Sequence, residues 1–283
     1  RKEFIALIKK TKSLQSTSGR EGERIGSDKK FYRHSDVRNL KGTVPAAKNR
    51  RKSNDIKVST KPVIVIDPGH GGIDPGSTSG RVFEKHITLA AAKAIASHLK
   101  NLGRYKVFLT REKDKFIRLR KRISIAKAYG ASLFISIHAD AIKNRRVRGL
   151  SVYTLSETAS DKEAAELARK ENKSDVIAGV DLSIETPVVS DILIDLRQRN
   201  TMNESSKFAI GLVKHMRKVT KTLSNAHRFA GFAVLKSPDI PSILIEMGFL
   251  SNRADEKALL NPKHRAQMAR SIGNAVDEYF LKN

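Results

Sequence analysis

The chain contains no cysteine and no tryptophan, and only 6% of its 283 residues are aromatic. The absence of cysteine excludes a disulfide framework, a thiolate zinc site and a cysteine nucleophile. The scarcity of aromatic side chains argues against a surface on which nucleic-acid bases stack. No stretch reaches the roughly 18 consecutive apolar residues that a membrane-spanning helix needs. We therefore expect a chain that does not span a membrane and whose chemistry does not use a thiol.

No signal-peptide pattern is visible at the start of the chain, which begins with Arg1. Exported proteins lose such a segment during secretion. We therefore expect a mature or shortened form, and the N-terminus assigns no compartment.

Positive charge is abundant and unevenly distributed. The formal net charge is +26, and residues 1–60 carry 17 Lys and Arg against 6 Asp and Glu. A basic surface attracts anionic partners such as nucleic acid, anionic lipid or an acidic polymer. A solvated tail that keeps the protein soluble is the alternative for residues 1–60. Because no aromatic-interleaved basic strand or recognition-helix motif is present, we do not expect a nucleic-acid partner.

The chain divides into a tail and one domain. Residues 1–60 are rich in Ser, Gly, Lys and Arg without apolar periodicity, which predicts a basic, flexible linker. From residue 61 to residue 283, short β-branched runs alternate with helical patterns, which predicts an α/β fold with a mostly parallel central sheet and helices on both faces. A polar, helical insert covers about residues 156–204. The predicted strands are 63–66, 105–109, 133–137, 150–155, 231–235 and 242–246, and the predicted helices outside the insert are 84–100, 117–129, 205–220 and 262–281.

Four residues suited to a metal site stand at the ends of these elements. His70 follows the first predicted strand in a glycine-rich turn, and His138 and Glu246 end two later strands. Glu84 begins the helix that follows His70. Because the carboxyl ends of parallel strands meet at one edge of a sheet, we expect the four side chains to lie together.

Their chemistry favours a hydrolytic zinc centre. Two imidazoles and one carboxylate, here His70, His138 and Glu84, are a usual ligand set for catalytic zinc. Glu246 is then a candidate to carry a proton between water and a leaving amine. Taken singly, a strand-end histidine is more often a hydrogen-bonded structural residue, and a glutamate at a helix start is more often a partner of the helix dipole.

Two aspartates near these residues have less defined roles. Asp140 lies two positions after His138, so it either orients a ligand or approaches the metal itself. Asp67 is expected to hydrogen-bond the glycine turn. The other histidines of the domain are expected at the surface: His86, His98, His215 and His264 in helices and His227 in a loop.

The motifs around these residues resemble the zinc-dependent N-acetylmuramoyl-L-alanine amidases of the type that separates daughter cells. The resemblance is carried by residues 67–72 (DPGHGG), 84–85 (EK), 136–140 (SIHAD) and 241–252 (PSILIEMGFLSN). It implies cleavage of the amide between N-acetylmuramic acid and L-alanine in peptidoglycan. It also implies a Zn²⁺ cofactor held by His70, Glu84 and His138, with Glu246 as the catalytic glutamate. Many relatives carry a substrate-targeting domain before the catalytic one, whereas only the basic linker precedes it here.

The resemblance to the Gram-negative branch also implies a periplasmic location, a helical insert that blocks the zinc, and an activator with a LytM-type domain at the division septum. Within the insert, residues 160–163 (SDKE) form a capping-box pattern that predicts a helix. Glu171 lies on the apolar face of that helix, where an acidic residue needs a strong partner such as zinc. We therefore expect Glu171 to occupy the open zinc position; fraying of Glu171 into solvent is the alternative.

A second helix in the insert is predicted from Thr186 as N-cap and Pro187 as its first residue. Its apolar face either packs on the domain or binds the activator.

Two other functions remain open from the sequence. A related zinc peptidase acting on another bond of the wall peptide would use the same metal chemistry. A basic module that binds an anionic polymer would need no metal chemistry. Against this function, the positive charge is concentrated in residues 1–60, away from the strand-end residues.

Overall fold

The computed structural model describes residues 61–177 and 192–282. The predicted linker over residues 1–60 lies outside this described part. The predicted helix start at Thr186 and Pro187 also lies outside it.

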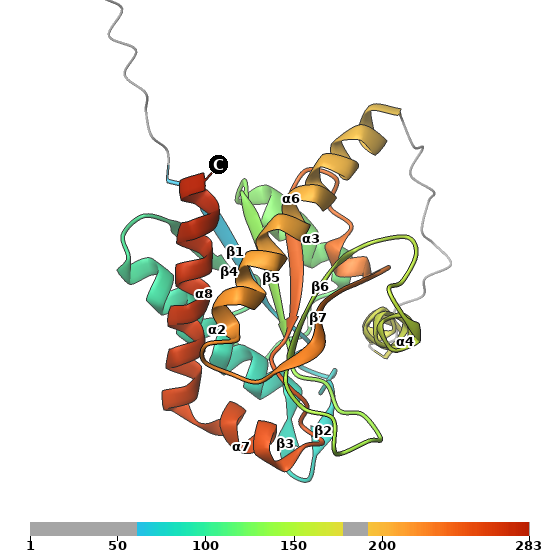
Figure 1. Ribbon diagram of the computed structural model, residues 1–283. Helices are drawn as coiled ribbons and strands as arrows, with labels where there is room; N and C mark the ends of the chain where they lie inside the picture. Colours follow the sequence, from blue (N-terminus) through green and yellow to red (C-terminus); the bar gives the residue numbers. More distant parts are fainter. Residues whose placement is uncertain (1–60, 178–191, 283) are drawn as a thin grey trace, which may run out of the picture. The chain divides into compact units, whose positions relative to one another are not determined.

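A six-stranded, mostly parallel sheet forms the centre of the domain, as predicted (Figure 1). The strand order is β4-β1-β5-β8-β6-β7. Strands β4, β1, β5 and β8 run parallel to one another, and β6 runs parallel to β7. The pair of β6 and β8 is antiparallel. The strands are β1 (Val63–Pro68), β4 (Lys106–Leu109), β5 (Leu133–His138), β6 (Leu150–Leu155), β7 (Thr222–Ala230) and β8 (Ser242–Glu246).

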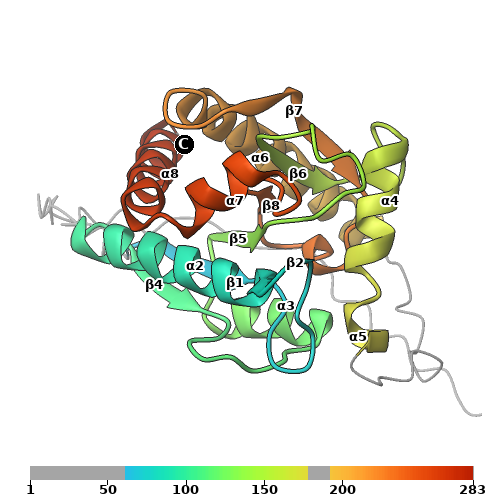
Figure 2. The same ribbon diagram turned by 90° about the horizontal axis from the view of Figure 1, so that it is seen from below.

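Helices cover both faces of this sheet, which confirms the predicted architecture (Figure 2). One face packs against α2, α6 and α8, and the other against α3, α4 and a short 3₁₀ helix, η2. The helices are α2 (Glu84–Asn101), α3 (Leu119–Ala128), α4 (Lys162–Glu171), α5 (Ser174–Ile177), α6 (Ile192–Met216), α7 (Arg253–Leu260), α8 (Pro262–Lys282) and η2 (Ala233–Leu235).

The alternation of side chains along the strands explains the two layers. In β1, Ile64 and Ile66 enter the core under α2 and α8, whereas Val65 enters the core on the opposite face. Successive side chains of a strand point to opposite faces, so a strand covered on both sides must be apolar throughout. The uninterrupted apolar runs of the sequence are therefore those of interior strands.

Some predicted boundaries are wrong. The strand predicted at residues 231–235 is instead η2, and the last strand before β8 is β7, which ends at Ala230. His227 consequently lies in a strand rather than a loop. A small hairpin of β2 (Thr78–Ser79) and β3 (Val82–Phe83), and the helix α7, had not been predicted. Both are short, so they leave little periodicity to detect.

None of the helices in the described residues is both long enough and apolar enough to cross a membrane.

Candidate metal centre

The sheet brings the four predicted site residues to one edge. His70 follows β1, whereas His138 and Glu246 are the last residues of β5 and β8. These two strands are adjacent and parallel, and His138 is the register partner of Glu246. Glu84 is the first residue of α2 and is completely buried. The predicted clustering is therefore what the fold produces.

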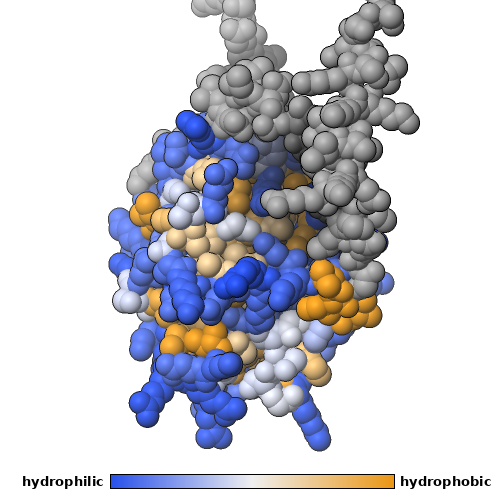
Figure 3. Space-filling view, turned by 90° about the vertical axis from the view of Figure 1, so that its right-hand side faces the viewer, coloured by the Kyte–Doolittle hydropathy of each residue, from blue (hydrophilic) through white to orange (hydrophobic). Residues whose placement is uncertain are grey.

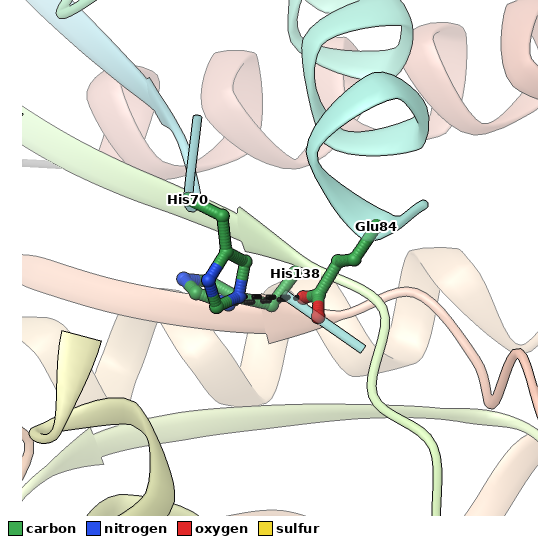
Figure 4. A group of neighbouring side chains, drawn as sticks. All are labelled: His70, Glu84 and His138. Carbon is green, nitrogen blue, oxygen red and sulfur yellow. Dashed lines mark hydrogen bonds and ion pairs between the residues drawn. The ribbon is translucent and has the colours of Figure 1, made fainter. Parts of the chain in front are cut away.

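Three of these residues point their polar atoms at a common space (Figure 4). Oε1 of Glu84 lies 3.1 Å from Nε2 of His70 and 3.2 Å from Nδ1 of His138. The two imidazole rings meet edge to face, with centroids 4.8 Å apart. Candidate ligand atoms from all three side chains lie within 4.8 Å of one another. This spacing suits a single ion coordinated by all three residues.

Glu246 belongs to the same cluster but is held by a separate contact. The backbone N–H of Asp140 donates to its Oε2 at 2.9 Å. Its Oε1 is buried and has no hydrogen-bond partner among the described residues. One carboxylate oxygen is thus fixed by the backbone, and the other faces the site.

His70 sits in an unusual backbone conformation. Its φ angle is +58°, a left-handed value that a residue with a side chain rarely adopts. Glycine is required beside it, because a Cβ at Gly69 would lie 2.4 Å from Cε1 of His138. The turn must therefore be held in place by other parts of the molecule.

Two buried arginines hold this turn. Arg111 donates to the carbonyl oxygens of Pro68 and Gly69 at 3.0 and 2.8 Å. Arg122 donates to the carbonyl oxygens of Pro68 and His70 at 2.7 and 2.9 Å. Both side chains are only 1% exposed. They satisfy carbonyl groups that the turn cannot pair within itself.

Asp67 acts through one of these arginines instead of bonding the turn directly. Its carboxylate accepts hydrogen bonds from Thr110, Arg122 and Ser136. Burial disfavours the ionised group, but the positive charge of Arg122 and these bonds lower the pKa of Asp67 overall. The expected bond from Asp67 to the glycine turn is replaced by an ion pair with Arg122.

A residue that the sequence did not reveal, Asp74, orients His70. Nδ1 of His70 donates to Oδ2 of Asp74 at 2.9 Å, which leaves Nε2 facing Glu84. A carboxylate that binds the far nitrogen of a ligating histidine fixes its tautomer and ring orientation. Asp74 also accepts a hydrogen bond from Ser174, which lies just after α4. In the sequence, only the position of Asp74 four residues after His70 could have indicated this role.

The insert helix α4 places Glu171 at the centre of the cluster. Oε2 of Glu171 lies 3.3 Å from Nε2 of His70 and 3.2 Å from Nδ1 of His138. The side chain is 5% exposed, so the alternative that it frays into solvent is wrong in this structure. Glu171 also forms a second group of possible metal ligands, with His138 and Glu246.

Lys170 contacts Asp140, the other residue whose role was open. Its Nζ donates to a carboxylate oxygen of Asp140, and to Oγ of Ser77 at 2.6 Å. The Asp140 carboxylate therefore faces Lys170 and Ser77, while its backbone N–H supports Glu246. In the described residues, Asp140 is in neither group of possible metal ligands.

The helix α4 begins one residue later than the predicted capping box. Asp161, rather than Ser160, is the N-cap, and its Oδ1 accepts from the N–H of Ala164 at 2.8 Å. Nε of Arg228 donates to the other oxygen of Asp161 at 2.8 Å. The charged partner on β7 favours an aspartate cap over a serine.

The cluster concentrates buried negative charge. Burial disfavours the ionised form of Glu246 and raises its pKa well above the usual range. Burial has the same effect on Glu84, but His70 and His138 outweigh it and lower the pKa of Glu84. Burial opposes protonation of His138, yet Glu171 raises its pKa to about 10. The positive charge of the histidines therefore compensates Glu84 and Glu171, whereas burial and the neighbouring carboxylates favour the protonated form of Glu246.

The residues present fit a divalent metal ion. Nε2 of His70, Oε1 of Glu171 and Oε1 of Glu246 are buried and have no hydrogen-bond partner within the described ranges. Buried polar atoms normally have a hydrogen-bond partner or bind an ion. Nitrogen and carboxylate ligands in this combination are those of zinc sites.

The fold and the site together define an α/β protein with a candidate divalent-metal centre, a histidine and glutamate cluster at the carboxyl edge of its sheet. Comparison with known proteins is more specific. The chain belongs to the N-acetylmuramoyl-L-alanine amidase family, which matches residues 64–278.

Individual relatives agree with this membership. The chain is 37% identical over 240 residues to the N-acetylmuramoyl-L-alanine amidase AmiA of Salmonella typhimurium, covering 84% of this chain and 83% of that relative. It is 40% identical over 222 residues to the amidase AmiC of Neisseria meningitidis, covering 78% of this chain but 53% of AmiC. The chain therefore spans about half the length of that relative.

A solved structure supports the fold. The N-acetylmuramoyl-L-alanine amidase from Clostridium difficile 630 superposes with a TM-score of 0.59 at 23% identity, covering 80% of this chain and 100% of the other. At this level of identity the similarity concerns the fold alone.

Proposed function

We propose that this protein is a zinc-dependent hydrolase that cleaves the amide bond between N-acetylmuramic acid and L-alanine in peptidoglycan. The observation that carries the proposal is the pairing of His138 with Glu246 at the ends of adjacent strands, beside His70 and Glu84. Membership of the amidase family supports the choice of bond. Nε2 of His70, Nδ1 of His138 and the Glu84 carboxylate would hold the zinc.

The chemistry of the proposal divides between the ion and the protein. A zinc ion bound there would polarise the amide carbonyl and make water more acidic. Oε1 of Glu246 takes the proton of the attacking water and delivers it to the nitrogen of the leaving amine. The Asp140 N–H holds Oε2 of Glu246, so the other oxygen stays directed at the reacting atoms.

The decisive experiment combines a zinc assay with analysis of digested muropeptides, for the wild type and for Glu246→Ala, each also measured with Glu171→Ala so that the block proposed below is absent. We expect the variant to retain zinc and to lose cleavage, because Glu246 lies outside the His70, Glu84 and His138 group. Glu166→Ala, an exposed position on α4, is the matched control. Products containing intact stem peptides and a free lactyl group identify the amidase.

Other products would identify another function. Cleavage elsewhere in the peptide would indicate a different zinc wall peptidase. Polymer binding without stoichiometric zinc or cleavage would indicate a basic binding module and contradict the proposal.

We also propose that α4 keeps the enzyme inactive by placing Glu171 in the open zinc position. The contacts of Glu171 with His70 and His138 support this role. Further contacts fasten the same segment to the domain: Asn172 bonds Gly231 and Ala233, and Asp175 accepts from the N–H of Leu119. Substrate cannot approach the histidines through the space that Glu171 occupies.

The proposed setting is the periplasm, where a LytM-type activator at the septum would displace α4. The amidases AmiA and AmiC among the relatives support this setting. An activator of this kind should stimulate the wild type strongly and Glu171→Ala little. Equal stimulation of both would contradict displacement of α4 as its mode of action.

Peptidoglycan carries carboxylates, so the positive charge of the chain supports it as partner. The side of the molecule that bears α4 is mostly hydrophilic, with separate apolar patches (Figure 3). Binding to purified sacculi should weaken between low and high salt. We also propose the division of the chain. The linker covers residues 1–60 and the catalytic domain covers residues 61–283, with the regulatory insert at about residues 156–204.

A further inference from the structure

A basic pocket lies beside the metal centre, outside the residues assigned to the reaction. It has a volume of about 820 Å³. Its walls come from the β2–β3 hairpin (residues 78–80), the loop after β5 (residues 141–145) and the start of α7 (residues 251–256).

Two of these walls continue directly into the metal centre. Ser77, which precedes the hairpin wall, donates its N–H to Oε2 of Glu84 at 2.7 Å. Asp140, which precedes the loop wall, donates its N–H to Glu246. The two walls also join each other, because the N–H of Ala141 donates to Oγ of Ser77 at 3.0 Å. A substrate at the metal centre therefore has this pocket as its neighbour.

The loop wall is also fastened to α7. The N–H of Ile142 donates to Oγ of Ser251 at 3.1 Å, and Nδ2 of Asn252 donates to the carbonyl oxygen of Arg145 at 2.7 Å. Asn252 additionally caps α7. The loop is thus fastened by hydrogen bonds between its backbone and two uncharged side chains, which do not use the charged side chains of the pocket.

The charged side chains of the pocket are mainly positive. Lys143, Arg145 and Arg253 are exposed, and Glu256 is the single acidic residue that lines the described walls. Within the described ranges, none of the three cationic side chains has a hydrogen bond or ion pair. Arginine presents a planar fork that matches a carboxylate. The free groups suit a ligand with more than one carboxylate.

A second pocket with basic residues lacks this connection. It lies along α2, is lined by Lys93 and Lys100 among others, and has a volume of about 520 Å³. None of its lining residues belongs to the metal centre or directly adjoins one of its members. Positive charge alone therefore does not distinguish the pocket beside the metal centre, whereas its position does.

We propose that the pocket beside the metal centre binds the carboxylates of the stem peptide, with Arg145 and Arg253 as the residues that recognise them. This inference rests on the amidase function proposed above. The sugar side of the scissile bond is a neutral N-acetylated ring, whereas the peptide side carries carboxylates. The pocket accordingly receives the peptide side, and its cations favour stem peptides whose carboxylates are free over amidated ones.

The test measures binding of the dipeptide L-Ala-D-Glu and of its diamide to the zinc-loaded protein by NMR titration. Neither ligand contains the bond that the enzyme cleaves, so binding is measured without turnover. We expect the dipeptide to bind about tenfold more tightly than the diamide, the effect of one charge-assisted hydrogen bond. In Arg145→Gln/Arg253→Gln this preference should fall below about twofold.

The matched control is Lys93→Gln/Lys100→Gln, which removes the same charge from the pocket along α2. It should keep the tenfold preference. The proposal would be overturned if the preference for the dipeptide persisted in the arginine variant. It would also be overturned if both variants lost the preference equally, or if the wild type showed none. Undetectable binding of the dipeptide would also overturn it.

A kinetic measurement separates this proposal from the amidase function. With N-acetylmuramoyl-L-Ala-D-Glu as substrate, and with Glu171→Ala present to remove the proposed block, Arg145→Gln/Arg253→Gln should raise KM about tenfold and leave kcat within about twofold. An unchanged KM would contradict the pocket. If Glu171→Ala alone cleaves neither this substrate nor its diamide, the amidase function fails, while the binding preference still decides whether the pocket recognises carboxylates.

Discussion

Arg122 and Asp67 form a buried ion pair in which Nη1 lies 2.8 Å from Oδ1. The same guanidinium donates to the carbonyl oxygens of Pro68 and His70. One side chain thus links the end of β1 to the turn that carries a candidate metal ligand. Its length and fork are needed for both contacts, because an ammonium group could not reach them all.

Arg122→Lys should weaken zinc binding about tenfold and destabilise the protein by about 2–4 kcal/mol. Lysine keeps the charge beside Asp67 but leaves carbonyl groups of the turn unpaired, so the backbone at His70 relaxes. Chelator competition measures the affinity, and denaturant unfolding measures the stability. Arg104→Lys, which alters a surface pair with Asp277, is the control. Equal effects in both variants would contradict this role of Arg122.

Gly76→Ala should abolish zinc binding, whereas Gly80→Ala should not. Both glycines have positive φ angles, +67° and +56°, so both substitutions incur similar backbone strain. A Cβ at Gly76 would lie 2.6 Å from Cδ2 of His70 and 2.7 Å from Oε2 of Glu84, whereas a Cβ at Gly80 meets no described atom within 4 Å. Zinc stoichiometry after gel filtration distinguishes them. Full zinc content in Gly76→Ala would show that the crowding is relieved elsewhere.

Asp74→Asn should reduce zinc affinity by 10- to 100-fold, the typical effect of losing a carboxylate behind a ligating histidine. The amide no longer fixes the proton on Nδ1 of His70. Asp114→Asn is a suitable control, because Asp114 binds the N–H of Gly72 in the same loop without touching the histidine. Comparable losses in both variants would assign the effect to the loop rather than to the orientation of His70.

Glu171→Ala should raise basal activity on purified sacculi, since it removes the carboxylate that lies against both histidines. Glu166→Ala, on the exposed side of the same helix, should leave activity unchanged. Release of soluble muropeptides over time measures the difference. Unchanged activity in Glu171→Ala would remove Glu171 as an inhibitory residue.

The sequence predicted the cluster because its members stand at the ends of strands. His138 and Glu246 end apolar runs, and parallel pairing of those runs places their ends together. Glu84 begins the first long helix of the domain, so its place was also visible. The position of a residue in the fold can be predicted in this way when the residue lies at the end of a strand or the start of a helix.

The supporting residues were not readable. Arg111 and Arg122 reach the His70 turn from segments 41 and 52 positions further along the chain. Nothing in their local pattern distinguishes them from the many surface arginines of this basic protein. Their role arises from the parallel pairing of β1 with β4 and the position of α3, which depend on packing across the whole sheet.

The last strands show the same limit. The sequence predicted a strand at residues 231–235 because that segment is apolar. The strand is instead β7, where polar and apolar residues mix at the edge of the sheet, and the apolar segment forms η2 beneath α3. The apolar composition of residues 231–235 is explained by burial of this segment against α3, and it does not require a strand.

The register of β5 with β8 has a consequence for how this enzyme could diversify. His138 and Glu246 are partners in one ladder, so the hydrogen-bonded spacing of about 4.8 Å between neighbouring strands sets their separation. The hairpin at residues 78–83 and the loop at residues 141–148 are outside that ladder. Changes of length or charge in these loops can therefore alter the surroundings of the cluster while the separation between His138 and Glu246 stays constant.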